Sequence, residues 1–258
     1  MSKRQDRLRA VAVAATAIAQ VIASPLTTRA IGPSSNTGVI SEDNISPVTP
    51  AGYAFAIWGL IYLTCMALAV YQLLPGQQHR EIHRRTGWWL VGAFTASAIW
   101  IPIFGSRLLW LGQVVILALV GCLAVAAIRL ASMSPAATSE RILLRLPVMI
   151  YLGWALLASA AGFGTMFRSL GLPEAGTLVT AVSLILVAAA TVGAVIIVLR
   201  LTAVAGFVFA ACWALVAVAV GTYDSSVRFA AIVSVGAVLI ALIVRSLRTR
   251  RAGTVLLG

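Results

Sequence analysis

The sequence predicts an all-α fold, a polytopic bundle of about eight transmembrane helices. Of the 258 residues, 61% are hydrophobic and only 10% are charged, and the mean hydropathy is +1.01. A soluble domain has about 25% charged residues, because it must present a solvated surface to water. The apolar residues also run in stretches of about 20, enough to cross about 30 Å of hydrocarbon, and basic residues flank these stretches.

A membrane helix needs roughly 20 apolar residues, since each residue rises about 1.5 Å along the axis. Eight segments meet this requirement. In chain order they are residues 9–26, 51–74, 87–105, 108–130, 142–167, 175–199, 202–221 and 227–246.

The first segment has two interpretations. Basic residues from Lys3 to Arg9 precede the apolar stretch Val11–Ser24, a pattern that is also typical of a signal peptide cleaved near Ala23 and Ser24. We favour an uncleaved helix, because eight crossings place both termini on one side of the membrane.

The distribution of basic residues predicts which side that is. If the N-terminus is cytoplasmic and every segment crosses, 15 Lys and Arg residues lie inside and four lie outside, namely Arg29, Arg107, Arg168 and Arg228. This bias indicates cytoplasmic termini, and we expect the cytoplasmic (inner) membrane of a bacterium. The net charge of +12 therefore reflects topology. Since the basic residues flank apolar runs instead of forming one polar face, we expect no nucleic-acid partner.

The longest connection, Thr27–Pro50, follows the first segment on the predicted outer side. It is rich in Ser, Thr, Asn, Pro and Gly, so we expect a loop and not a helix. A lid over the bundle and a plain tether are both open interpretations.

No catalytic or metal-binding set stands out. Every Asp and Glu falls in a loop or at the end of a span, which argues against an ion-coupled transporter. Cys65, Cys122 and Cys212 each lie in an apolar run and are expected to be packing residues. His79 and His83 are four residues apart, but neighbouring arginines would repel a cation. We therefore predict no metal and no required cofactor, and enzymatic activity is not indicated.

The aromatic residues are more informative. Three tryptophans open predicted spans and fit the membrane interface: Trp88, Trp89 and Trp110. Aromatic residues deeper in the spans are Trp58, Trp100, Trp154, Tyr62 and Tyr151, with Tyr53 nearby. Buried indoles usually face a bundle or a cavity. Core packing and an aromatic cavity for a flat apolar molecule are both consistent with this pattern.

Three segments resemble the signatures of one family, the translocator proteins or tryptophan-rich sensory proteins (TspO/MBR). Residues 49–62 (TPAGYAFAIWGLIY) are similar to the second-helix signature of that family. Residues 97–104 (SAIWIPIF) resemble its third-helix signature, and residues 151–158 (YLGWALLA) its fifth. The resemblance covers about residues 1–167, and residues 168–258 lie outside it as a three-helix membrane extension.

The resemblance implies a five-helix bundle with a pocket for porphyrins or similar apolar ligands, capped by the first loop. By position, Trp58 and Trp154 would be the facing tryptophans, and Ala158 would lie on the wall one turn from Trp154. The other implied ligand-binding residues are Trp100, Tyr62, Tyr53, Ser97, Tyr151 and Pro50. A tetrapyrrole, haem or protoporphyrin, is the implied ligand.

The chain also departs from the family pattern. Thr49 stands in place of the first proline of a Pro-Pro turn, Ser97 in place of an asparagine, and Ile150 in place of a proline. Residues 161–164 (AGFG) replace an Asn-rich end of the fifth span. The identity of the ligand is therefore open.

We predict a membrane protein that binds an apolar ligand as a sensor or carrier. A secondary transporter or permease subunit using all eight helices is one alternative, and porphyrin degradation is another. The expected partners are membrane lipid and an apolar small molecule. A homodimer is also compatible with the sequence, and the role of the last three spans is open.

Overall fold

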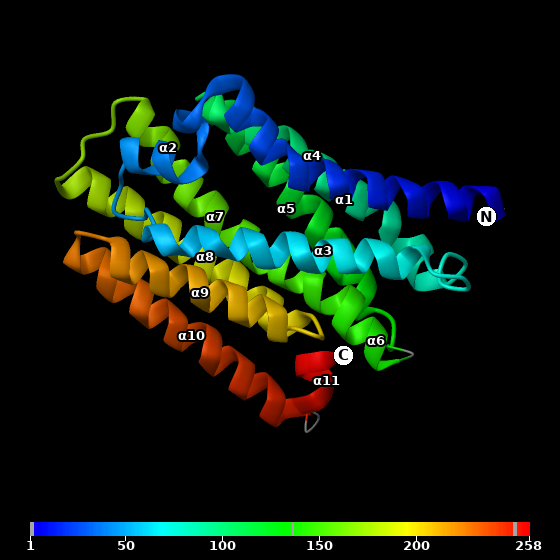
Figure 1. Ribbon diagram of the computed structural model, residues 1–258. Coiled ribbons are helices and arrows are strands. Elements are labelled where there is room, and N and C mark those ends of the chain that lie inside the picture. Colours follow the sequence, from blue (N-terminus) through cyan, green and yellow to red (C-terminus); the bar gives the residue numbers. More distant parts are fainter. Residues whose placement is uncertain (1–2, 136, 250–251) are drawn as a thin grey trace.

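The computed structural model describes residues 3–135, 137–249 and 252–258, and every regular element in these ranges is a helix (Figure 1). Seven of the described helices are long and apolar enough to cross a membrane. They are α1 (Lys3–Ile31), α3 (Ile57–Leu73) with the preceding 3₁₀ helix η2 (Gly52–Ala56), α4 (Glu81–Gly105), α5 (Leu109–Ala131), α7 (Leu146–Ser169) with the turns before it, α8 (Thr177–Arg200) and α10 (Ser225–Thr249). The predicted all-helical membrane bundle is confirmed.

The eighth predicted span is a shorter helix. Residues 202–221 contain α9 (Ala205–Gly221), which has 17 residues and is at the lower limit for crossing a bilayer. Ala203 has a φ of 60°, and a left-handed residue cannot continue into a right-handed helix. The helix therefore begins after the turn.

The apolar helices run from one end of the bundle to the other, with α7 at the centre (Figure 1). α7 packs against α3, α5, α8 and α9, while α1 lies along α3 and α4. The start of α1 and the C-terminal helix α11 (Ala252–Leu257) lie at the same end of the bundle. This arrangement agrees with an even number of crossings. Which side of the membrane that end faces stays a prediction.

Helices α7 and α9 approach each other at glycines. A Cβ atom on Gly153 of α7 would lie 2.6 Å from the carbonyl oxygen of Phe207, and one on Gly206 of α9 would lie 2.8 Å from that of Leu146. Small residues at such points let two backbones come close, which is the main source of packing energy between helices in lipid. α9 is thus a closely packed neighbour of the central helix.

The prediction that residues 27–50 form a loop without helix was wrong. α1 continues through Pro25 to Ile31, and the 3₁₀ helix η1 (Pro33–Ser35) and the helix α2 (Thr37–Asp43) follow. The Asn36 side chain accepts a hydrogen bond from the backbone N–H of Gly38 (2.9 Å), which caps α2. Ile40 is fully buried on the inner face of α2. The polar composition of this segment therefore did not predict α2, which the Asn36 cap and the buried Ile40 stabilise.

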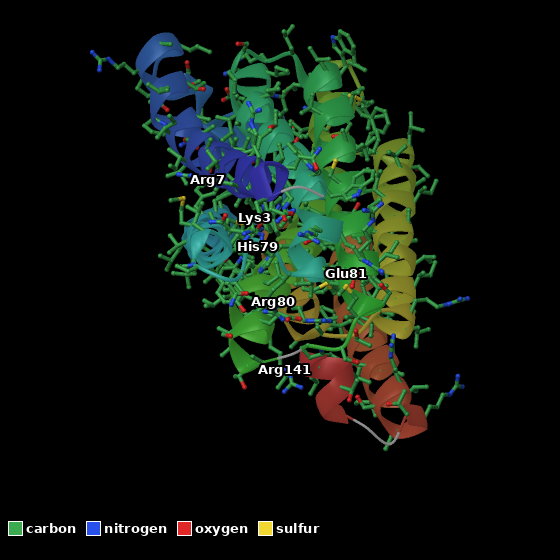
Figure 2. All side chains as sticks on the ribbon, turned by 90° about the vertical axis from the view of Figure 1, so that its right-hand side faces the viewer. Lys3, Arg7, His79, Arg80, Glu81 and Arg141 are labelled. Carbon is green, nitrogen blue, oxygen red and sulfur yellow. The ribbon has the colours of Figure 1, made fainter. Side chains whose placement is uncertain are left out.

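Polar residues gather at the end that holds the start of α1 (Figure 2). α4 begins six residues earlier than predicted, so Arg84 reaches the fully buried Asp6 on α1. Arg9 also pairs with Asp6 at 2.9 Å. His79 lies before α4 and contacts Asp6, whereas His83 is buried against Tyr71, so the two histidines do not share a helix face. No group of three metal-ligating side chains occurs among the described residues.

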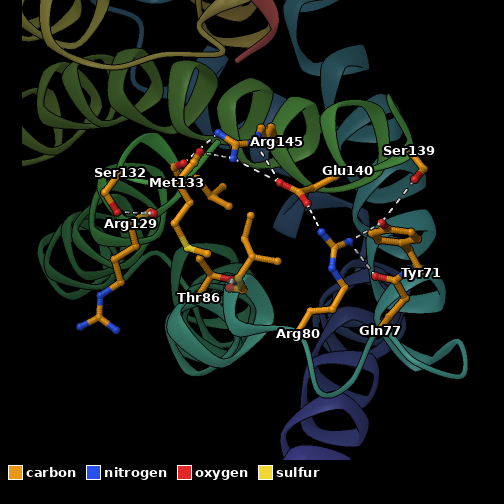
Figure 3. Close-up of polar contacts among 12 residues, drawn as sticks. Tyr71, Gln77, Arg80, Thr86, Arg129, Ser132, Met133, Ser139, Glu140 and Arg145 are labelled. Atoms are coloured by element: carbon orange, nitrogen blue, oxygen red, sulfur yellow. Dashed lines mark hydrogen bonds and ion pairs between the residues drawn. The ribbon is translucent and has the colours of Figure 1, made fainter. Parts of the chain in front are cut away.

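A second polar group joins α3, α4 and α7 at the same end (Figure 3). Before α7 the chain forms the short helix α6 (Thr138–Glu140) and the π-helical turn η3 (Arg141–Arg145). The Glu140 carboxylate is fully buried and receives hydrogen bonds from Arg80 and Arg145. Arg145 also donates to the carbonyl oxygen of Leu130 at 2.8 Å. These contacts fasten the start of α7 to the ends of its neighbours.

Candidate functional site

A cluster of aromatic rings lies inside the bundle around Trp58 of α3. The Trp58 ring stacks on Trp100 of α4 with centroids 5.9 Å apart and planes 26° apart. It meets Trp154 of α7 edge to face, at 6.1 Å and 84°, and Tyr151 in the same way at 6.0 Å. These are favourable geometries for aromatic pairs. Three helices therefore each contribute a ring to one buried cluster.

The cluster continues toward the end of the bundle opposite the buried Asp6 and Glu140 ion pairs. Phe55 of η2 packs edge to face on Trp154 at 6.2 Å, and Trp100 stacks on Phe104 at 4.8 Å. Trp154 is 2% exposed, and its indole N–H has no hydrogen-bond partner among the described residues. A buried indole N–H normally finds an acceptor, so this unpaired donor is an exception within the cluster.

Two small cavities adjoin these rings. The first has a volume of about 40 Å³ and is lined mainly by aromatic and small residues, with Pro50, Ala158 and Gly162 among them. The second, of about 180 Å³, lies on the other side of Trp58 and Trp100 and extends to the end of α1. Phe55, Trp58 and Trp100 line both, so these side chains separate the two chambers.

The segment that precedes η2 covers the chambers. Thr37 and Ser41 of α2 line the first chamber, and Thr37 also lines the second. The sequence left open whether this segment is a lid or a plain tether. Its position at the chambers favours a lid.

The structure brings six of the nine predicted site residues to the chambers. Five line the first chamber: Trp58, Trp154, Ala158, Trp100 and Pro50. Tyr62 lines the second together with Trp58 and Trp100. Tryptophans 58 and 154 thus meet at one cavity, with Ala158 on its wall, as the resemblance implies. Whether these residues bind a ligand stays a prediction.

The other three predicted residues do not line either chamber. Tyr53 is 44% exposed and packs edge to face on Trp213 at 5.3 Å. Tyr151 is fully buried beneath Trp58, with its hydroxyl 3.3 Å from the Gln20 side-chain oxygen. Ser97 is fully buried, and its hydroxyl has no hydrogen-bond partner in the described chain.

Sequence reasoning missed two contributions to the site. Phe55 lies within the quoted motif, but nothing marked it as the ring between the chambers. α9 was not assigned to the site at all. The Trp213 indole donates to the carbonyl oxygen of Ala54 at 3.1 Å, and the backbone N–H of Ala51 donates to the carbonyl oxygen of Ala217 at 2.9 Å. Helix α9 therefore anchors the segment that carries Phe55.

The lining side chains favour a particular kind of ligand. None of the described residues that line the two chambers carries a charge. The available interactions are aromatic stacking, apolar contact and hydrogen bonds from hydroxyl and indole groups. Such a surface suits a flat, mostly apolar molecule.

The comparisons with known proteins agree with this description. A family model described as "TSPO-like protein" matches residues 9–244. Neither a curated protein nor a solved structure matches the chain. The match extends well beyond residues 1–167, which carry the three signatures, and includes α8, α9 and most of α10. With its membrane-spanning helices and buried aromatic cluster, the chain belongs to the TSPO-like protein family.

Proposed function

We propose that this integral membrane protein binds a planar apolar molecule of the tetrapyrrole type among the rings of Trp58, Trp100 and Trp154, and that it acts as a sensor or carrier for it. The observation that supports the proposal best is the geometry of the three tryptophans. They come from three helices and line one cavity. A ring system that enters this cavity can stack on one face and meet the edge of another.

Ligand entry requires the site to expand. The chambers of about 40 and 180 Å³ are each smaller than the roughly 300–1,000 Å³ of typical small-molecule pockets. Among the described residues, Thr37 of α2 and the rings of Phe55, Trp58 and Trp100 line both chambers. We expect rotation of these rings, or displacement of α2, to merge the chambers when the ligand binds.

The test is replacement of the central tryptophans by phenylalanine. Trp58→Phe and Trp154→Phe should each weaken protoporphyrin binding about two- to tenfold, because each change removes stacking area and an indole N–H worth roughly 0.5–1.5 kcal/mol. Affinity is measured by titrating porphyrin absorbance against folded protein in detergent. Trp88→Phe is the control, since Trp88 is 47% exposed and at the start of α4, far from the chambers. Unchanged affinity in both pocket variants would remove the support for this site.

We also propose that the site opens on the outer side of a bacterial cytoplasmic membrane, with the polar end in Figure 2 in the cytoplasm. A cysteine at Glu42 should react with a membrane-impermeant maleimide in intact cells. A cysteine at Arg85 should react only after permeabilisation. Both positions are exposed, so accessibility of the residue does not limit labelling. The protein with its native Cys65, Cys122 and Cys212 provides the background. The reverse labelling pattern would contradict the proposed orientation.

A further inference from the structure

The second chamber has two chemically different walls. One wall is aromatic and consists of Phe55, Trp58, Tyr62 and Trp100. Apart from Ile101, the rest of the lining is polar. It contains Ser24, Thr27 and Thr28 of α1, followed by Ser35, Asn36 and Thr37. A ligand in this chamber would therefore contact rings on one side and hydroxyl groups on the other.

The three α1 residues form a single polar face. Their spacing, i, i+3 and i+4, places them on one side of the helix. In the described part of the chain none of the three hydroxyls has a hydrogen-bond partner, and none is sealed off from the chamber. By contrast, the hydroxyl of Thr16, earlier on the same helix, donates to the carbonyl oxygen of Ala12 at 2.8 Å. Such backbone bonds are the usual arrangement for a helical threonine.

The charges around the chamber restrict what the polar wall can bind. Every described residue that lines it is uncharged. Arg107, which lies at this end of the bundle, pairs with Asp43 and does not line the chamber, and neither does Arg29 at the end of α1. A carboxylate that entered the chamber would lose its hydration without gaining a counter-ion, which is costly. A carbonyl, ester or hydroxyl group could accept a hydrogen bond from the threonines at little cost.

We infer that the second chamber is a subsite for the uncharged, hydrogen-bonding edge of the ligand, with Thr27 and Thr28 as the donors and the ring system stacked on the Trp58 wall. This inference rests on the proposed function and specifies the class of ligand. The preferred molecule is a planar apolar ring with carbonyl, ester or hydroxyl substituents in place of free carboxylates.

Three porphyrins that differ at their edges test the inference on the full chain in detergent, with empty micelles as the partition blank. They are protoporphyrin IX with two carboxylates, its dimethyl ester, and etioporphyrin, which has alkyl groups only. The ester should bind about three- to tenfold more tightly than etioporphyrin, the effect of one ordinary hydrogen bond. It should also bind more tightly than the free acid, whose carboxylates would lose their hydration in the chamber. If the free acid binds as tightly as the ester, or etioporphyrin does, the subsite is wrong while the aromatic site stands. If no porphyrin binds, the proposed function fails as well.

A pair of matched variants locates the effect. The double variant Thr27→Val and Thr28→Val keeps the shape of the wall, including the methyl group of Thr27 that packs near Gly105. It should remove the three- to tenfold advantage of the ester over etioporphyrin and leave etioporphyrin affinity nearly unchanged. Thr16→Val is the control on the same helix, because its hydroxyl is bonded to the backbone away from the chamber. If the double variant does not fold, Thr28→Val alone serves, since Thr28 is only half-buried. An equal loss for all three porphyrins would assign the threonines a structural role and overturn the inference.

Discussion

Replacing Glu140 with glutamine is expected to lower the free energy of unfolding by about 3–5 kcal/mol, the usual cost of removing one partner from a buried ion pair. The Glu140 carboxylate is fully buried, and Arg145 beside it is 1% exposed. Both Arg80 and Arg145 point to it in Figure 3. Glutamine keeps the size of the side chain but not its charge. The guanidinium groups of Arg80 and Arg145 would then lie close together with no negative charge between them.

The matched control is Glu81→Gln. Glu81 pairs with Arg85 one turn along α4, and both side chains are at least half exposed. An exposed pair of this kind contributes about 0.3–0.5 kcal/mol. The free energy of unfolding of both variants is measured in mixed detergent micelles of increasing SDS content. A Glu140 variant as stable as the Glu81 variant would mean that water screens the Glu140 cluster in the folded protein.

The Glu140 cluster illustrates what a single sequence can predict. The rule that acids lie in loops or at span ends placed both Asp6 and Glu140 correctly. Their partners could not be predicted, because Arg80 is 60 residues from Glu140 and Arg84 is 78 residues from Asp6. Apolar length predicts where a helix crosses, but it has no information about which helices meet. Pairing is a property of the packed bundle.

The candidate site was likewise predicted only in part from the sequence. The three signatures predicted the neighbours Trp58, Trp100 and Trp154, because the family resemblance implies which residue of each helix faces the inside of the bundle. Tyr53 does not line either chamber, since Gly52–Ala56 is a 3₁₀ helix, and its tighter turn changes the direction of side chains relative to an α-helix. The hydroxyl face of α1 carried no distinguishing signal, because serine and threonine commonly bond to their own helix. Only the structure shows that the hydroxyls of Thr27 and Thr28 do not bond to their own helix and that both residues line a cavity.

The role of the last three spans was also open from the sequence, and truncation tests it. A chain ending at Leu170 is expected to insert into the membrane, since its five spans remain apolar, but to lose protoporphyrin binding by at least about tenfold. The segment that carries Phe55 would lose two hydrogen bonds to α9, one donated by the Ala51 N–H to Ala217 and one accepted by the Ala54 carbonyl oxygen from Trp213. The face of α7 around Gly153 would also lose the close packing of α9. In lipid, that packing and those hydrogen bonds are the forces that hold the helices together.

Supplying residues 171–258 as a separate chain distinguishes a structural requirement from a failure of synthesis. If α9 anchors the mouth of the site, co-expression of this fragment should restore binding to the truncated chain, because the α7–α9 contact is between helices and needs no covalent link. A fragment with Gly206→Val should not restore it, since the added side chain would meet the backbone of Leu146. A fragment with Gly236→Val, where a Cβ atom meets nothing within 4 Å, should restore it fully. If the truncated chain alone binds protoporphyrin as tightly as the full-length chain does, residues 1–167 are instead a self-sufficient unit, as the resemblance to the five-helix proteins implies.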